Sequence, residues 1–234
     1  MKYPILRLIS AALTLSACAE NVFALKSGVA LPADARQSER YAAEEWCRWS
    51  SQVTGWTSDF VSEDNAGVVL RRDDTLGEDA FRLTADNGRL IVRGGRRGIL
   101  YGVYEALERF AGVGWFSLNT TVVPKKERIE VSEDLDDIER PAFEMRQPLF
   151  YELSNDPDLS ARLKVNAPQI KERHGACSHV FDNILGNSHT FYWLVPPEEY
   201  FAKHPEYYSE IDGLRIEAMQ KLNQLKPRSV GQAS

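Results

Sequence analysis

The chain has 234 residues, of which 43% are hydrophobic and 26% carry a charged side chain. These proportions are typical of a soluble globular protein, and the length allows one or two domains with a buried core. The formal net charge of −6 is modest. It therefore favours neither nucleic acid nor an anionic membrane surface as a partner.

The first 24 residues have the pattern of an export signal rather than of a folded element. Lys2 and Arg7 supply positive charge, and residues 8–17 form an apolar run too short to span a bilayer. Two cleavage sites compete. The sequence LSAC fits a bacterial lipobox in which Cys18 is lipidated, and we favour it because the cysteine directly follows the apolar run. The alternative is ordinary cleavage after VFA, at residues 22–24.

Both cleavage sites predict a protein that leaves the cytoplasm. Lipidation of Cys18 would give an outer-membrane or cell-surface lipoprotein, whereas ordinary cleavage would give a periplasmic or secreted protein. The lipid anchor is the only membrane contact that we expect.

A helix is expected over residues 34–53, with Asp34 as its N-cap and Gly55 at its end. Trp46 and Trp49 follow the apolar spacing of this helix. We therefore expect both rings in the core rather than as a platform for sugars.

The strongest local signal is a β-hairpin. Residues 81–85 and 89–93 alternate as strands do, and the sequence Asp-Asn-Gly at residues 86–88 favours a tight turn between them. A further strand is expected at residues 67–71.

Three glycines follow the hairpin and precede a second helix, over residues 99–110. A dinucleotide-binding turn needs the spacing G-x-G-x-x-G, and only Gly95 and Gly98 have its final spacing. The alternative is that Gly94, Gly95 and Gly98 allow a sharp turn and close packing of helix on sheet. We favour this second interpretation.

Three more short strands are expected at residues 113–116, 120–124 and 128–131. Together these elements predict a two-layer α+β sandwich over residues 25–138, with two helices against one sheet of four or five strands.

The segment RGILYGVYEALERFAGVGWF, at residues 97–116, resembles the N-terminal domains of α-glucuronidases and of bacterial β-hexosaminidases. It is also similar to the related domain-of-unknown-function family 4838. The resemblance implies an accessory domain that packs against a catalytic barrel without supplying the catalytic acid. The acidic pair Asp73-Asp74 and the acidic residues 134–137 are accordingly expected at the surface.

A second segment is expected over residues 141–234. Its opening sequence PAFEMR, at residues 141–146, resembles the first strand of the (β/α)₈ barrel in these enzymes. An arginine at the matching place in β-hexosaminidase-like enzymes holds sugar hydroxyls, which implies substrate binding for Arg146. A guanidinium suits vicinal hydroxyls because it presents several donors in a fixed fork. The alternative is a structural arginine paired with Glu144 or Glu152.

The run from residue 189 to residue 213 resembles family 4838, with the block HTF…VPP…YF..HPEY. It implies that His189 lies at the end of the second barrel strand, where it could bind a sugar hydroxyl or a substrate carboxylate. The alternative is a histidine that holds the loop before Pro196. His174, Cys177 and His179 lie close in sequence but fit no standard zinc spacing. We therefore expect no metal and no cofactor.

The segment from residue 141 has 94 residues, whereas a closed (β/α)₈ barrel needs about 250. We expect the first β/α units of an incomplete barrel, without the later strands that carry the catalytic acids, as in a truncated gene product.

The sequence therefore predicts the N-terminal part of an exported glycoside-hydrolase-like protein of polysaccharide breakdown, with glucuronoxylan as one substrate type. Two alternatives remain, a surface lipoprotein that binds polysaccharide or oligosaccharide without cleaving it, and a non-functional fragment. Whether the chain has enzymatic activity, and its oligomeric state, stay open.

Overall fold

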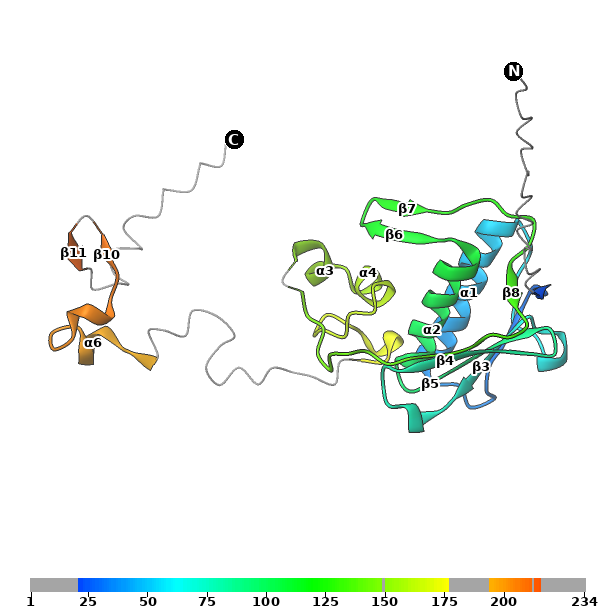
Figure 1. Ribbon diagram of the computed structural model, residues 1–234, viewed down its shortest axis with the longest axis horizontal. Coiled ribbons are helices and arrows are strands. Elements are labelled where there is room, and N and C mark those ends of the chain that lie inside the picture. The colour runs from blue at the N-terminus through cyan, green and yellow to red at the C-terminus, as the bar shows by residue number, and fades with distance from the viewer. Residues whose placement is uncertain (1–20, 149, 177–193, 212, 216–234) are drawn as a thin grey trace, which may run out of the picture. The chain divides into compact units, whose positions relative to one another are not determined.

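The computed structural model describes residues 21–148, 150–176, 194–211 and 213–215 (Figure 1). The chain divides into two compact units, Met1–Val180 and Phe181–Ser234. The predicted division lay near residue 140 instead. Residues 141–176 thus belong to the first compact unit.

The first unit contains a five-stranded mixed sheet with the strand order β2-β3-β5-β4-β9. Strands β2 (Val29–Ala30), β3 (Val68–Arg72) and β5 (Arg89–Gly94) are parallel. Strands β4 (Phe81–Asp86) and β9 (Asp136–Glu139) are antiparallel to their neighbours. This arrangement confirms the predicted α+β class.

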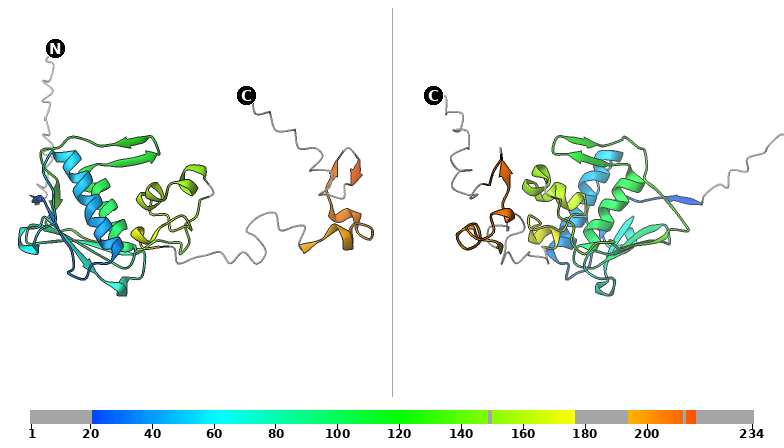
Figure 2. Two further views of the ribbon diagram at one scale, coloured as in Figure 1. Left: turned by 180° about the vertical axis from the view of Figure 1, so that it is seen from behind. Right: turned by 60° about the vertical axis from the view of Figure 1, so that its left-hand side comes forward.

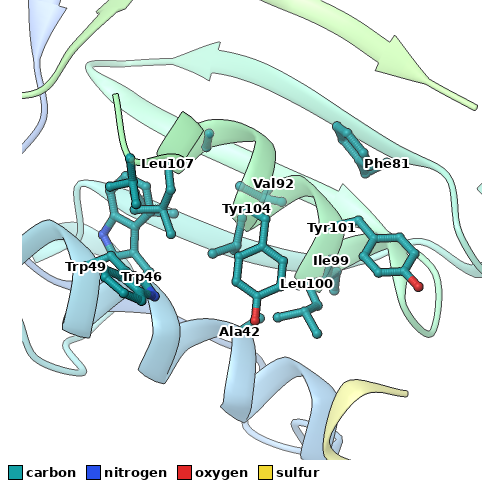
Figure 3. Packing of buried hydrophobic residues seen from close by; sticks show 14 of the residues in the cluster. Ala42, Trp46, Trp49, Phe81, Val92, Ile99, Leu100, Tyr101, Tyr104 and Leu107 are labelled. Atoms are coloured by element: carbon teal, nitrogen blue, oxygen red, sulfur yellow. The ribbon is translucent and has the colours of Figure 1, made fainter. Parts of the chain in front are cut away.

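Two helices cover one face of the sheet, α1 (Gln37–Thr54) and α2 (Gly98–Ala106), as Figures 1 and 2 show. A π-helical turn (Leu107–Ala111) continues α2, and Gly112 ends it in the left-handed conformation. The core lies between helices and sheet, with Leu100 and Tyr104 fully buried against α1 (Figure 3).

Helix α1 begins two residues later than its predicted N-cap. Arg36 is the N-cap, and its backbone N–H donates to the Glu39 carboxylate at 2.7 Å. Asp34 instead accepts a hydrogen bond from Arg72, at 3.0 Å. Gly55 ends the helix as predicted, with φ of 76° and its N–H donating to the Ser51 carbonyl. Trp46 and Trp49 are 2% and 5% exposed, so both are core residues as predicted.

The predicted hairpin is confirmed as β4 and β5, which turn at Asn87 and Gly88 with φ of 51° and 73°. The glycines that follow it allow close packing. A Cβ at Gly95 would lie 1.9 Å from the Gly77 carbonyl oxygen, and one at Gly98 would lie 2.0 Å from that of Ala80. The N–H groups of Arg97 and Gly98 both donate to the Glu78 carbonyl. These amides are therefore engaged within the chain rather than arranged around a phosphate.

Two small antiparallel pairs complete the strands of the first unit. Strand β1 (Val22–Ala24) pairs with β8 (Glu130–Ser132). Strand β6 (Gly114–Ser117) pairs with β7 (Thr120–Val122).

The segment after β9 differs from its prediction. Residues 141–146 form no strand, so the described residues show no first barrel strand, and the barrel stays a prediction. Pro141 and Pro148 lack the N–H that strand pairing needs, and the Arg146 N–H donates to the Asn166 side chain.

Two short helices follow, α3 (Tyr151–Asn155) and α4 (Pro157–Arg162), and a 3₁₀ turn at Glu172–His174. Asp156 caps α4 by accepting from the Leu159 N–H at 2.8 Å.

The second unit is described over residues 194–211 and 213–215. It contains α6 (Pro197–Tyr200), a 3₁₀ turn (Pro205–Tyr207) and a hairpin of β10 (Glu210–Ile211) and β11 (Leu214–Arg215). Throughout the described residues, no helix combines the length and the apolar character needed to cross a membrane.

Candidate functional site

A hollow of about 590 Å³ lies at one corner of the five-stranded sheet. The register of the sheet explains its position, because Phe81 at the start of β4 pairs with both Gly94 and Glu139. The loop before β4, the turn after β5 and the segment after β9 therefore leave the sheet at the same place. We call this the corner hollow; it is lined by Leu76, Gly77, Glu78, Asp79, Ala80, Arg97, Arg140, Pro141, Ala142, Phe143, Glu144 and Arg146.

Asp79 joins three parts of the chain at the base of the corner hollow. Its Oδ1 accepts from Arg97, and its Oδ2 accepts from Arg146 at 2.8 Å and from the Asn166 amide at 2.9 Å. The side chain is 12% exposed. Both carboxylate oxygens are thus engaged in hydrogen bonds that hold the fold.

The Arg97 guanidinium is 1% exposed and lies against Asp79. It also donates to Glu78 at 2.6 Å and to the Ala176 carbonyl at 2.8 Å. Burial alone would lower the pKa of Arg97, but the Asp79 carboxylate beside it raises that pKa above its usual value. Arg97 is therefore a permanent buried cation whose charge Asp79 and Glu78 balance.

Arg146, the predicted sugar-binding residue, lines the corner hollow but has structural partners on all three guanidinium nitrogens. Nε donates to the Lys164 carbonyl, Nη1 to the Phe143 carbonyl and Nη2 to Asp79, at 2.8, 2.9 and 2.8 Å. This geometry favours the structural alternative, with Asp79 rather than Glu144 or Glu152 as partner. A role in sugar binding stays a prediction.

Two residues at the rim of the corner hollow were not singled out by the sequence. Phe143 is 74% exposed. Arg140 is exposed, and its Nη1 donates to the Leu76 carbonyl at 2.9 Å. Phe143 belongs to a run that alternates like a strand, so its exposure had no distinct local signal.

The second predicted binding residue, His189, lies outside the described residues. So do Cys18, which the lipobox predicts to be lipidated, and Cys177 and His179 of the weak zinc pattern. Among the described residues, no group of three or more His, Cys, Asp or Glu side chains is placed to hold a metal ion.

His174 is described, and its ring is fully buried. Its Nδ1 accepts from the Lys171 N–H at 3.1 Å, and its Nε2 lies 2.8 Å from Asp158. An accepting Nδ1 and a carboxylate beside Nε2 fit a neutral ring that carries its proton on Nε2, although Arg173 Nε also lies 3.2 Å from Nε2. Burial lowers the pKa of His174 below 6.5. This histidine is a structural residue of the first unit.

A second buried carboxylate, Glu45, joins three helices. It is 3% exposed and accepts from the Trp49 indole, the Tyr104 hydroxyl and the Arg162 guanidinium, at 3.0, 3.1 and 3.1 Å. Burial raises the pKa of Tyr104 well above its usual value, so this hydroxyl remains protonated and donates to Glu45. The cluster fastens α4 to α1 and α2.

The acidic residues that were expected at the surface have structural partners there. Asp74 pairs with Arg36, Asp136 with Arg82 and Asp137 with Arg109. Asp73 accepts from the Thr75 N–H at the start of a 3₁₀ turn.

The family model described as "Domain of unknown function (DUF4838)" matches residues 115–225, slightly less than half of the chain. The matched range includes the block that begins at His189, through which the sequence resembles this family, and also the PAFEMR block at residues 141–146, which resembles the first barrel strand of the glycoside hydrolases. It also spans the boundary between the two compact units.

Solved structures similar to this chain include three glycoside hydrolases. A GH20 β-N-acetylhexosaminidase from Streptomyces coelicolor A3(2) is 15% identical, with a TM-score of 0.48 over 62% of this chain and 31% of that one. The GH115 4-O-methyl-α-glucuronidase BtGH115A is 16% identical, with a TM-score of 0.46 over 68% and 30%. A GH20 exo-β-N-acetylglucosaminidase from Vibrio harveyi is 15% identical, with a TM-score of 0.43 over 62% and 22%. The chain thus spans less than a third of each structure.

A curated relative matches over a short stretch only. The tRNA uridine 5-carboxymethylaminomethyl modification enzyme MnmG from Alkaliphilus oremlandii is 78% identical over 27 residues, which are 12% of this chain and 4% of that protein. The stretch is too short to assign the chain to that protein's family.

Proposed function

We propose that this chain is part of an exported glycoside-hydrolase-like protein that takes part in polysaccharide breakdown, with glucuronoxylan-type chains as the substrate class. Within it, the unit described over residues 21–176 is an accessory unit that contacts the polysaccharide and does not cleave it.

The observation that carries this proposal is the match to family 4838 over residues 115–225. It includes PAFEMR, which resembles the first barrel strand of glycoside hydrolases, and HTF…VPP…YF..HPEY, which resembles family 4838 itself. The α-glucuronidase-like segment at residues 97–116 supports the same assignment, because it folds as the helix and strand that the resemblance implies.

The non-catalytic role is supported by the chemistry of the corner hollow. Glycoside hydrolysis ordinarily needs two carboxyl groups roughly 5–10 Å apart, one of them able to donate a proton. Glu78 and Asp79 are instead paired with Arg97, and Asp79 also with Arg146. These two carboxylates are therefore committed to structural ion pairs.

The function can be tested on the full chain with insoluble glucuronoxylan, cellulose and chitin. We expect it to co-sediment with glucuronoxylan and to release no reducing sugar. Co-sedimentation with none of the three polysaccharides would contradict the carbohydrate assignment. Release of sugar that scales with protein concentration would contradict the non-catalytic role.

Export has a separate test. The mass of the mature protein from a bacterial host should correspond to a chain that begins at a diacylated Cys18. A mass with residues 1–17 still attached would contradict processing by the lipoprotein route.

A further inference from the structure

We propose that the corner hollow is a binding subsite for one neutral sugar ring of a polysaccharide, with Phe143 as its stacking platform and Arg140 as its main hydroxyl-binding residue. The inference rests on the proposed function and adds a location and a ligand charge that the function does not specify.

The size and rigidity of the corner hollow suit a preformed site. Its volume of about 590 Å³ lies within the range of small-molecule pockets, which is roughly 300–1,000 Å³. Asp79 fixes its base by joining Arg97, Arg146 and Asn166. A sugar ring that enters therefore meets a wall whose side chains are already ordered, which lowers the entropic cost of binding.

Phe143 supplies the apolar part of sugar recognition. Its side chain is 74% exposed although it follows Pro141 at the rim of a hollow. The backbone around it is fixed, because Pro141 restricts the chain and the Phe143 carbonyl accepts from Arg146 at 2.9 Å. A pyranose ring has one face of C–H groups that can pack flat on such an aromatic side chain.

Arg140 supplies hydrogen-bond donors beside that platform. Its Nη1 is held by the Leu76 carbonyl at 2.9 Å. Within the described part of the chain, its Nε and Nη2 make no hydrogen bond and carry three N–H donors. The anchored guanidinium can thus present its other edge to two neighbouring hydroxyls.

The charge balance of the corner hollow selects a neutral ligand. Three guanidinium groups line it, those of Arg97, Arg140 and Arg146, and three carboxylates, those of Glu78, Asp79 and Glu144. A free anion would meet the exposed Glu78 and Glu144, and a free cation would meet Arg140. A polyol avoids both repulsions and can use donors and acceptors together. We therefore assign the subsite to an uncharged backbone sugar rather than to an acidic side group.

The test measures binding of the full chain to xylohexaose and cellohexaose by isothermal titration calorimetry. The variants are Phe143→Ala and Arg140→Met, each expected to weaken binding roughly tenfold. Phe116→Ala is the matched control for Phe143, because Phe116 is 70% exposed on β6 and does not line the corner hollow. Arg40→Met is the control for Arg140, because Arg40 is also exposed and donates to one loop carbonyl, that of Ala35.

Loss of affinity in both hollow variants, with both controls unchanged, would support the subsite. Equal affinity in wild type and Phe143→Ala would overturn the subsite while leaving the proposed function intact, because the polysaccharide would then bind elsewhere. Absence of oligosaccharide binding by a wild-type chain that still co-sediments with glucuronoxylan would overturn it as well. A glucuronic acid-bearing oligosaccharide that binds more than tenfold better than xylohexaose would contradict the neutral ligand.

Discussion

The layered part of the first unit, residues 22–139, and the segment that follows it, residues 141–176, are held together differently. The layers join chiefly through apolar burial, with residues such as Leu100 and Tyr104 fully inaccessible, and also through the ion pair between the buried Glu39 of α1 and Arg72 of β3. The segment contributes apolar residues to the same core, among them Leu159 and Val165, and buried polar contacts add to its attachment. Its Arg146 and Asn166 bind Asp79, and its Arg162 binds Glu45.

This difference has a functional consequence, because the corner hollow lies where the two regions meet. Its volume depends on the segment being held beside the sheet. Substitutions at these polar contacts should therefore change the attachment of residues 141–176, and ligand binding in the corner hollow, without disturbing the core between helices and sheet.

The largest effect is expected for Asp79→Asn, which leaves the buried Arg97 without its main counter-charge. Breaking such a pair costs roughly 3–5 kcal/mol in the free energy of unfolding. Chemical denaturation measures this loss. Hydrogen exchange should locate it, with protection lost first in residues 150–176 and retained in β3, β4 and β5. Uniform loss across the unit would contradict a separate polar attachment.

Leu100→Ala tests the other region. Removing this fully buried side chain leaves a cavity between α1, α2 and the sheet, at a cost of about 3 kcal/mol. Here we expect lower protection throughout the unit, since the layers share one core. If Leu100→Ala lowered hydrogen-exchange protection only in residues 150–176, the proposed difference between the layers and the segment would be wrong.

A smaller, pH-dependent effect is expected from His174. Burial lowers its pKa in the folded state below 6.5, so the unfolded state binds more protons in this range. The contribution of the neutral His174 ring to the free energy of unfolding is therefore complete above pH 6.5, and it is lost as the pH falls through the folded-state pKa. Charging Nδ1 would also set an N–H against the Lys171 N–H that it now accepts from.

The pH effect can be checked by thermal unfolding between pH 7.5 and pH 5. We expect the Tm of the wild type to decline over this range, and His174→Asn should make that decline smaller. Asp158, which contacts His174, does not contribute to the change of Tm between pH 7.5 and pH 5. Although burial raises the pKa of Asp158, hydrogen bonds from Arg173 and His174 lower it below 3.8 overall. An identical decline in the variant would contradict this assignment.

The smallest effect is expected at the surface of the layers. Asp136→Asn breaks the ion pair with Arg82, in which both side chains are about half exposed. Exposed pairs contribute little because water and salt screen them. We expect an unchanged Tm within experimental error. A clear destabilisation would mean that exposed ion pairs also stabilise the layers.

The sequence predicted the elements that depend on local pattern, but not the contacts between residues far apart in the chain. The hairpin at residues 81–94 and the helix after it follow from local turn chemistry and periodicity, and both are confirmed. The contacts of Asp79 could not be predicted in this way. Its partners Arg146 and Asn166 lie 67 and 87 residues further along the chain, and no local pattern connects such positions.

The expected strand at residues 141–146 shows the same limit. Its resemblance to a barrel strand is local, but strand pairing also needs free backbone donors. The Arg146 N–H is instead bound to Asn166. A side chain 20 residues further along thus occupies a backbone donor that strand pairing would need, and no local pattern indicates this contact.

The measurement that tests the central claim most directly is the affinity of Asp79→Asn for xylohexaose, taken where circular dichroism shows the sheet still folded. We predict that binding falls below detection, because Asp79 holds the two walls of the corner hollow together without lying at its rim. Wild-type affinity in that variant would contradict the claim that the polar attachment of residues 141–176 creates a sugar-binding site.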